Sequence, residues 1–504
     1  MAAPLSPISI AAPGFYGLNT QDSSVSVGQN FALVADNAVI DSYGRVGARK
    51  GYEVFSDTDS TDIIYCIHEH VNKDGTTALY ASGGADFYSI DETTGAVTSE
   101  YTDSTSPAEG NWQAMSFNNS IYFFREGQDP IVNEVGGSGW AELSSYSKMP
   151  AGVTAAGVGL SAYGRIWMAR TNLGKTTVYW SDTLIGTDFI SGTAGAIDLE
   201  LVFTNGTDEI THLAAFNGRL VIFCKKSIII YAGAEEPATM KVEDVIDGVG
   251  CIARDSVQDI GTDILFLSDT GLRSLGRVIQ EKSAPMRDIS RNVRDNLLTD
   301  AASGNIVKSA YYEKDAFYLL SVPALQKVWC FDLRSQLDDG SFRVTTWSGV
   351  AFSAFCASRD RQLYIATSLR VSKYGGYQDN GSAFTFSYFT TNLDAGATAN
   401  LKMLKGASFI VVGGSNTTMT VKWDVDYGSN YASRVFSFPA SSSGEYNVDE
   451  YTVAEFSIGN IINRKSVTLS KTGRVFQLGF EAQINGSPLS IQQIEILVKG
   501  GRTV

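Results

Sequence analysis

His68 and His70 come closest in this sequence to the spacing of a metal site. They flank Glu69, and alternation along a β-strand would put both imidazoles on one face, a usable arrangement for two metal ligands. His212 is the only other histidine, so a third ligand would have to be a carboxylate or water. Two ordinary exposed strand histidines are the simpler interpretation. We therefore predict no metal site and no cofactor.

Two glycine patterns resemble nucleotide-binding motifs, but each lacks something that the chemistry requires. The residues at 174–176 (Gly-Lys-Thr) match the end of a phosphate-binding loop, yet the position that must hold its first glycine is Ala169. The glycines at 157, 159, 413 and 414 do not open a helix after a strand, which a dinucleotide-binding unit needs. We interpret all of them as structural, with 174–176 in a hairpin loop.

Carboxylates in pairs could act as a general acid and base, but none here has a supporting context. Glu235 and Glu236 are adjacent in an acidic loop, as are Asp338 and Asp339, and such pairs usually serve solvation. Residues 268–271 (SDTG) fit neither the spacing nor the terminal Trp of the Ser-x-Asp-x-Gly-x-x-Trp boxes of sialidases. We predict that the protein is not an enzyme.

The composition favours strands and turns over helices. Among 504 residues there are 49 glycines, 26 phenylalanines and 23 tyrosines, and charged residues make up 18%. The net charge of −15 argues against a protein that grips nucleic acid through its phosphates. No run of about 18 apolar residues and no basic stretch before the first apolar segment occur, which predicts synthesis in a cytoplasm without membrane insertion. The five cysteines contain no CxxC pair and are predicted to be buried thiols in strands.

A recurring unit of alternating apolar strands and short turns predicts a β-propeller. The unit recurs at 63–90, 115–135, 160–182, 213–233, 260–275, 310–333 and 355–375. Its central strand residues return about every 42 to 54 positions, the spacing of four-stranded propeller blades. We therefore predict an all-β fold with a propeller of about seven blades over residues 59–380. Two or three stacked sandwiches would show similar hairpins and remain the alternative.

The segments on either side of the repeats differ from it. Beyond about Asn380 the strands become longer, which predicts a C-terminal β-sandwich over residues 381–504. Residues 1–58 are too short to fold alone and are predicted to be an extended N-terminal arm that joins another domain or a neighbouring subunit. Within this arm, residues 29–38 have a helix-like pattern.

One amphipathic helix is expected inside the repeat region. Ile289, Val293 and Leu297 are spaced four apart within residues 288–300, and Asp288 is a suitable N-cap. The basic residues beside this stripe would form a solvated or partner-facing side. We predict that an acidic partner docks on them: Arg287, Arg291 and Arg294.

Three groups of residues, taken in order, resemble one family. The first is 14–22 (GFYGLNTQD), 35–38 (ADNA) and 44–51 (GRVGARKG); the second is 217–231, followed by 248–253, 265–269 and 289–298; the third is 473–480, leading to 487–491 (SPLSI). Together they make the chain similar, over nearly its full length, to the tail nozzle proteins of short-tailed bacteriophages, also called tail hub or tail tubular protein B. The resemblance implies a structural virion protein.

The resemblance also implies an assembly. It implies a homohexameric ring at the end of the virion tail, attached to the adaptor below the portal, supporting fibres or spikes, with viral DNA leaving through its lumen. An acidic wall fits this role, because it repels DNA and lets it slide without sticking. The alternative is a propeller protein that binds or hydrolyses polysaccharide at the host surface.

Overall fold

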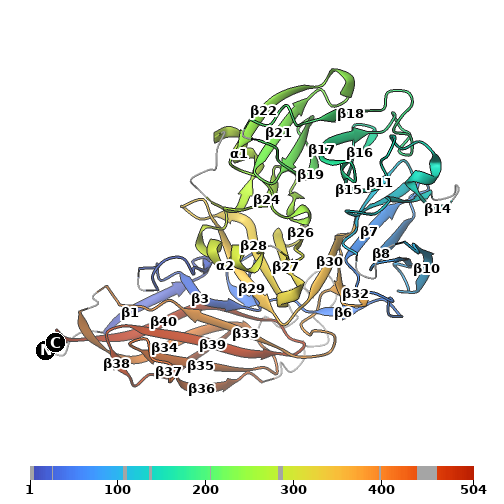
Figure 1. The fold of residues 1–504 in the computed structure, drawn as a ribbon. Coiled ribbons are helices and arrows are strands. Elements are labelled where there is room, and N and C mark those ends of the chain that lie inside the picture. Colours follow the sequence, from blue (N-terminus) through green and yellow to red (C-terminus); the bar gives the residue numbers. More distant parts are fainter. Residues whose placement is uncertain are drawn as a thin grey trace.

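Strands dominate the structure, which is a computed structural model that describes residues 5–24, 26–105, 110–134, 139–204, 206–281, 288–302, 304–396, 399–439 and 462–503. Within these ranges the chain forms strands β1 to β40, two short α-helices and several 3-10 turns. The all-β prediction is therefore confirmed. A ring of sheets lies above a flat C-terminal part, and the N-terminal strands run between the two (Figure 1).

In the described part of the chain, six blades of four antiparallel strands each form a β-propeller; five are separate sheets, and the fifth along the chain is part of a ten-stranded sheet. The first consists of β7 (Cys66–Val71), β8 (Thr77–Ser82), β9 (Asp86–Ile90) and β10 (Val97–Thr102). The second consists of β11 (Gln113–Phe117), β12 (Ser120–Phe124), β13 (Ile131–Glu134) and β14 (Gly139–Glu142). The third consists of β15 (Ala156–Ala162), β16 (Arg165–Thr171), β17 (Gly174–Trp180) and β18 (Gly195–Asp198). The fourth consists of β19 (Ile210–Phe216), β20 (Arg219–Cys224), β21 (Ser227–Ala232) and β22 (Lys241–Asp247). The fifth consists of β26 (Lys308–Tyr312), β27 (Phe317–Val322), β28 (Lys327–Gln336) and β29 (Phe342–Ser348). The sixth consists of β30 (Phe352–Ala357), β31 (Leu363–Thr367), β32 (Arg370–Tyr374) and, from the N-terminal region, β6 (Tyr52–Val54).

A smaller, three-stranded sheet lies between the fourth and fifth of these sheets along the chain. It consists of β23 (Gln258–Asp259), β24 (Ile264–Ser268) and β25 (Gly271–Ser274), and helix α1 (Leu275–Glu281) follows it directly. The 3-10 turns are η1 (Leu143–Tyr146), η2 (Pro237–Thr239), η3 (Arg254–Ser256), η4 (Arg291–Val293) and η5 (Pro323–Leu325). The innermost strands β7, β11, β15 and β19 contact one another in turn, η3 contacts β19 and β26, and β30 contacts β26 and β7, which closes the ring.

Face-to-face stacking explains why the middle strands are apolar on both sides. In β20 and β21 nearly every residue is buried, with Leu220 and Ile222 packed towards one neighbouring sheet and Val221 and Phe223 towards the other. The hairpin between β19 and β20 turns at Asn217 and Gly218, both with positive φ, as a two-residue turn of this kind requires.

Two layers of strands form the C-terminal part. One is a seven-stranded sheet of β1 (Leu5–Ala11), β4 (Ala38–Ile40), β5 (Val46–Ala48), β34 (Asn400–Gly413), β37 (Ile462–Thr468), β38 (Thr472–Gly473) and β40 (Leu489–Thr503). The other continues from β29 of the propeller through β2 (Gly17–Leu18) and β3 (Phe31–Asp36) to β33 (Phe384–Thr390), β39 (Phe476–Ile484), β35 (Thr418–Val425) and β36 (Ala432–Ser437). Phe409 and Phe480 pack across the two layers with ring centroids 5.4 Å apart.

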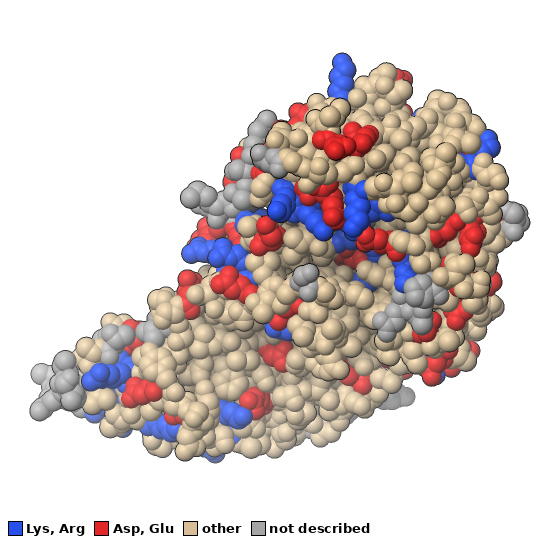
Figure 2. Space-filling model, viewed as in Figure 1, with Lys and Arg blue, Asp and Glu red and all other residues tan. Residues whose placement is uncertain are grey.

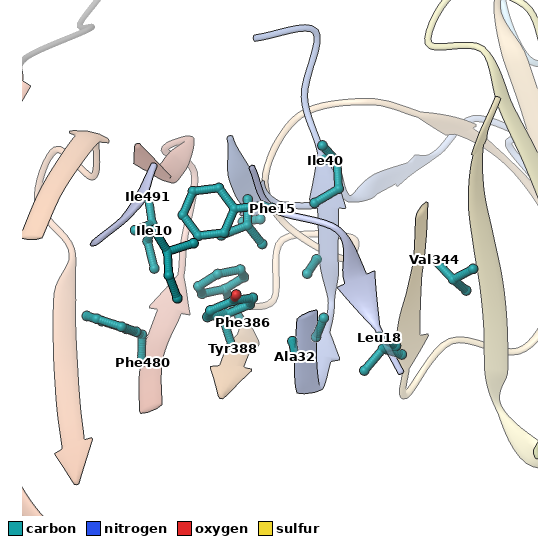
Figure 3. Packing of buried hydrophobic residues seen from close by; sticks show 14 of the residues in the cluster. Ile10, Phe15, Leu18, Ala32, Ile40, Val344, Phe386, Tyr388, Phe480 and Ile491 are labelled. Carbon is teal, nitrogen blue, oxygen red and sulfur yellow. The ribbon is translucent and has the colours of Figure 1, made fainter. Parts of the chain in front are cut away.

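The N-terminal strands lie inside this architecture rather than beside it. β6 pairs with β32 and so completes the last propeller sheet, while β1 pairs with β40 over its whole length. Ile10, Phe15 and Leu18 belong to the same apolar core as Tyr388, Phe480 and Val344 (Figure 3). One continuous core therefore joins the propeller to the C-terminal layers.

Two local predictions need correction. The helix-like segment 29–38 forms β3 and β4, because Ala32 and Ala35 pair with β33 and are buried there, which overrides their helix propensity. The helix predicted over 288–300 starts later, as turn η4 followed by α2 (Arg294–Asp300). Asp288 caps the preceding turn by accepting the N–H of Ser290.

Candidate interaction site at the propeller mouth

A cavity of about 480 Å³ opens where the innermost strands begin, and we call it the propeller mouth. The cavity is lined by residues that each lie within two positions of the first residue of an innermost strand: Tyr65, Asn111, Gly157, Thr211 and Ile306. Its charged lining residues come from turns and strand ends that surround the same opening: Arg125, Glu126, Arg170, Lys225 and Arg254. Sequence positions that are far apart therefore converge at one end of the propeller.

Arg254 spans the centre of this site. Its Nη1 donates to the carbonyl oxygen of Gly157 at 3.0 Å and its Nη2 to that of Asn111 at 2.8 Å, so it links turn η3 to two other sheets. Asp255 accepts from the same guanidinium at 2.7 and 3.1 Å and also pairs with Lys308 at 2.9 Å. Arg254 is thus the floor of the mouth, fixed by four hydrogen bonds.

The charges of this cluster are mutually dependent. Burial would raise the pKa of Asp255, but Arg254 and Lys308 outweigh it and hold that pKa well below its usual range. The side chains of Arg254 and Asp255 are each 14% exposed and that of Lys308 is 8% exposed. An ion cluster this sheltered is costly to break, since removing one member leaves a charge without compensation.

A second ion network forms the rim. Arg170 donates to Glu126 at 2.6 Å and to the carbonyl oxygen of Ile210 at 2.9 Å, and Lys225 pairs with Glu209 at 2.9 Å. Lys175 lies 3.3 Å from Glu126 and joins the two pairs. Arg170 has a positive φ of 56° at an irregularity in the β16–β17 pairing, a local distortion of the kind that redirects side chains.

The propeller mouth is basic although the chain is acidic. Four cations and one carboxylate line it, whereas the whole chain carries −15. Arg125 lies over the ring of Trp112 at 5.6 Å, and Gly110 leaves the room for it, because a Cβ there would lie 2.6 Å from Nη1. Figure 2 shows Lys and Arg side chains, with Asp and Glu between them, over the middle of the propeller.

An adjoining cavity of about 610 Å³ extends the mouth towards α2. The two cavities share Asn111, Lys225, Ile252, Arg254 and Ile306, so they form one groove. The far end of this groove is less polar and is lined by residues that follow and end α2: Leu298, Ala301, Ala302 and Val307. The site therefore combines cations with an apolar wall.

The predicted docking residues lie apart from the mouth. Arg287 falls outside the described residues. Arg291 pairs with Asp339 at 3.4 Å and Arg294 with Asp295 at 3.4 Å, and both side chains are about half exposed. Neither lines the groove, although Leu298 on the same helix does. Docking at these arginines remains a prediction.

The two strand histidines share a face as predicted, but they are not exposed. The ring nitrogens His68 Nε2 and His70 Nδ1 lie 2.7 and 2.8 Å from the hydroxyl oxygen of Ser116, between β7 and β11. Burial and the neighbouring His70 lower the pKa of His68 to about 4. The described part of the chain contains no group of three His, Cys, Asp or Glu side chains suited to a metal ion.

The other motif residues are structural in their surroundings. Gly174, Lys175 and Thr176 were predicted in a hairpin loop, but they are the first residues of strand β17, directly after the hairpin turn. Lys175 joins the rim network instead of a phosphate loop. All five cysteines are free thiols; four are in strands, while Cys251 lies in a loop. Burial raises the pKa of Cys66 to about 11, so this thiol is unreactive at neutral pH.

Comparison with known proteins adds little beyond the propeller. No protein-family model and no curated protein match the chain. Among solved structures, the WD40 domain of Neurospora crassa Pan2 is 9% identical, with 65% of this chain and 95% of that one covered at a TM-score of 0.38. BamB from Moraxella catarrhalis is 10% identical, with 74% and 100% covered at 0.37.

A longer protein is also similar. The extracellular domain of a one-component system from B. thetaiotaomicron is 9% identical at a TM-score of 0.41; the match covers 66% of this chain but only 40% of that one. In the part of the chain that the structure describes, neither helix has the length and hydropathy needed to cross a bilayer.

Proposed function

We propose that this chain is a structural protein of a short-tailed phage virion: a subunit of the tail nozzle or hub, not an enzyme. The observation that carries the proposal is the position of the N-terminal residues that resemble that family. They lie at the junction between the propeller and the C-terminal layers, where they share sheets and one apolar core with both parts. A motif in such a place serves architecture rather than chemistry.

Arg49 illustrates this role. Its side chain is fully buried and donates to both carboxylate oxygens of Asp379, at 2.8 and 2.6 Å, and to Oδ1 of Asn37 at 2.8 Å. The ring of Phe384 lies beneath the guanidinium at 4.1 Å. The last residues before the C-terminal layers are thereby tied to the N-terminal strands.

Gly17 illustrates it too. Its φ is +80°, and a Cβ would lie 2.2 Å from the carbonyl oxygen of Val344. β2 can therefore approach β29 only with glycine at this position, and the ten-stranded sheet depends on that approach. Both residues belong to the stretches that resemble the nozzle family.

The same proposal includes the path of DNA. The guanidinium of Arg254 crosses the propeller centre, so DNA would pass through a lumen shared by six copies rather than through one propeller. Edge strands β36 and β37 of the described sheets offer backbone groups for contacts between copies in such a homohexamer. The adaptor, the fibres or spikes and a virion-tail location complete the proposal.

Two finer features of the fold belong to this proposal. We count the three-stranded sheet β23–β25 with α1 as a reduced seventh blade, because η3 and β26 continue the inner ring beside it. We also take the two packed C-terminal layers as the β-sandwich of a platform domain, since their shared core includes Phe409 and Phe480.

Immunogold electron microscopy of the source culture tests the function, with antibody raised against the purified chain. Gold at the tail ends of short-tailed particles is the expected result. Label confined to particle-free protein would overturn the virion proposal. In that case binding or hydrolysis of host-surface polysaccharide, the alternative function, would be assayed next.

A further inference from the structure

We propose that the groove formed by the propeller mouth and its adjoining cavity binds a short acidic segment of a partner protein, with at least one apolar side chain among its carboxylates. This inference does not depend on the nozzle proposal. It rests on four properties of the groove: its charge, the exposure of one lysine, an unsatisfied acceptor and an apolar wall.

Charge selects the kind of ligand. The mouth has an excess of three positive charges, from four cations and Glu126, within a chain of −15. The acidic surroundings repel a long polyanion, whereas a short segment with a few carboxylates enters the local positive field. The adjoining cavity adds Lys226, Asp255 and Asp269, so the whole groove is lined by five cations and three carboxylates and stays positive.

Lys225 is placed to contact a ligand. It lines both cavities, its side chain is 52% exposed, and it forms an ion pair with Glu209 at 2.9 Å. Glu209 also has Lys175 at 3.5 Å and Arg170 at 3.8 Å, so it keeps cationic neighbours when Lys225 turns towards a carboxylate. The rigid floor at Arg254 requires no rearrangement, which lowers the cost of binding.

Asn111 adds a backbone-recognition group. Its Oδ1 is buried and has no hydrogen-bond partner among the described residues, although Asn111 lines both cavities. Buried acceptors are nearly always satisfied in folded proteins. A peptide N–H in the groove would satisfy this acceptor once the side chain of Asn111 turns towards the ligand, and a carboxylate supplies no such donor.

The apolar wall specifies the second part of the ligand. Ile252 is 39% exposed between the two cavities and lines both. Leu298 and Ala301 extend this apolar surface towards the end of α2. An apolar side chain that follows the carboxylates along the segment would cover Ile252 and lose its contact with water.

Fluorescence anisotropy with a labelled peptide tests the proposal. The probe is the fluorescein-labelled peptide GELEELEG, and its matched control is GQLQQLQG. We expect saturable binding of the acidic peptide that weakens as salt is raised, and binding of the glutamine peptide that is at least about tenfold weaker. Absence of saturable binding to the wild-type chain overturns the proposal.

Variants locate the binding. Lys225→Glu should weaken binding about tenfold or more, and Ile252→Ser about threefold, while Lys405→Glu on the exposed face of β34 should change it less than twofold. Thermal unfolding of each variant confirms that the fold is intact. Equal losses for Lys405→Glu and Lys225→Glu would overturn the site.

Competition separates the peptide from other anions. Unlabelled GELEELEG should displace the probe at lower concentration than pyrophosphate or a single-stranded DNA 12-mer does. The proposal would be overturned if pyrophosphate or the DNA displaced the probe at a lower concentration than the peptide does, and if Lys225→Glu abolished that displacement. The ligand of the groove would then be a phosphate compound instead of an acidic segment.

Discussion

Nη1 of Arg254 donates a 3.0 Å hydrogen bond to the carbonyl oxygen of Gly157, a residue 97 positions earlier in the chain. With its bond to Asn111, this contact draws three separate parts of the propeller towards one side chain. The centre of the propeller is therefore held by a charged group rather than by apolar packing.

Replacing Arg254 should destabilise the propeller. Arg254→Met leaves Asp255 paired with Lys308 and removes the donors to Gly157 and Asn111. We expect a loss of about 3 kcal/mol in the free energy of unfolding. Urea unfolding measures it. Arg361→Gln is the control, because Arg361 is 66% exposed, and should cost less than about 0.5 kcal/mol. Equal midpoints for the two variants would contradict the role of Arg254.

Lysine should not substitute for arginine at the junction. Arg49→Lys keeps the charge but cannot make the two parallel bonds to Asp379 together with the bond to Asn37, so we expect a loss of about 2 kcal/mol. Thermal or urea unfolding reports it. Arg464→Lys, at a side chain 70% exposed, should be neutral; a neutral Arg49→Lys would show that charge alone suffices.

Position 17 should require glycine for two reasons: its positive φ, and the lack of room for a Cβ beside Val344. Gly17→Ala puts a methyl group against Val344, whereas Gly75→Ala adds one in open space at a similar φ of +86°. We expect about 1 kcal/mol for Gly75→Ala, and a loss at least twice as large, or insoluble protein, for Gly17→Ala. Expression yield and unfolding midpoints compare them. Similar losses would mean that β2 can move away from β29.

Acid should weaken the fold through His212, whose side chain is partly buried. Burial lowers the pKa of His212 to about 4, with Asp255 and Arg254 acting on it in opposite directions, so the folded state disfavours its protonation. The resulting stability is present above pH about 6.5 and is lost as the pH falls through about 4. Melting temperatures between pH 7 and pH 4 should therefore fall less steeply in His212→Gln than in the wild type.

Asp129 provides a control of opposite sign. Burial raises its pKa to about 6, so its contribution to stability is lost as the pH rises from about 4 to about 6. Asp129→Asn should therefore make the acid-induced fall in melting temperature steeper. An unchanged profile in His212→Gln would show that this histidine is not linked to folding.

The pattern of apolar residues along each strand predicted the propeller, because this pattern shows which faces of a strand are buried. The strand runs around Leu220 and Ile264 are apolar on both faces, and the structure stacks sheets on both faces. The helix prediction for residues 29–38 was wrong because Ala32 and Ala35 fit a helix as well as a closely packed strand. Only the partner strand β33, more than 300 residues away, decides between them.

The propeller mouth could not be predicted in the same way. Arg125, Arg170, Lys225 and Arg254 are separated by tens of residues and follow no motif. They meet because the innermost strands start at one end of the ring. The basic residues near α2 could be predicted as a group from the sequence, because a helix places residues three or four positions apart on one face. In the structure, Arg291 and Arg294 each have a carboxylate partner.

The pairing of β1 with β40 has a consequence for synthesis. Leu5 aligns with Lys499, so this edge of the sheet stays open until nearly the whole chain has left the ribosome. At about 20 residues per second this takes about 25 s, during which Ile8 and Ile10 have no partner strand. β6 likewise waits for β32. Chains halted before residue 489 should therefore accumulate as aggregation-prone intermediates that chaperones retain.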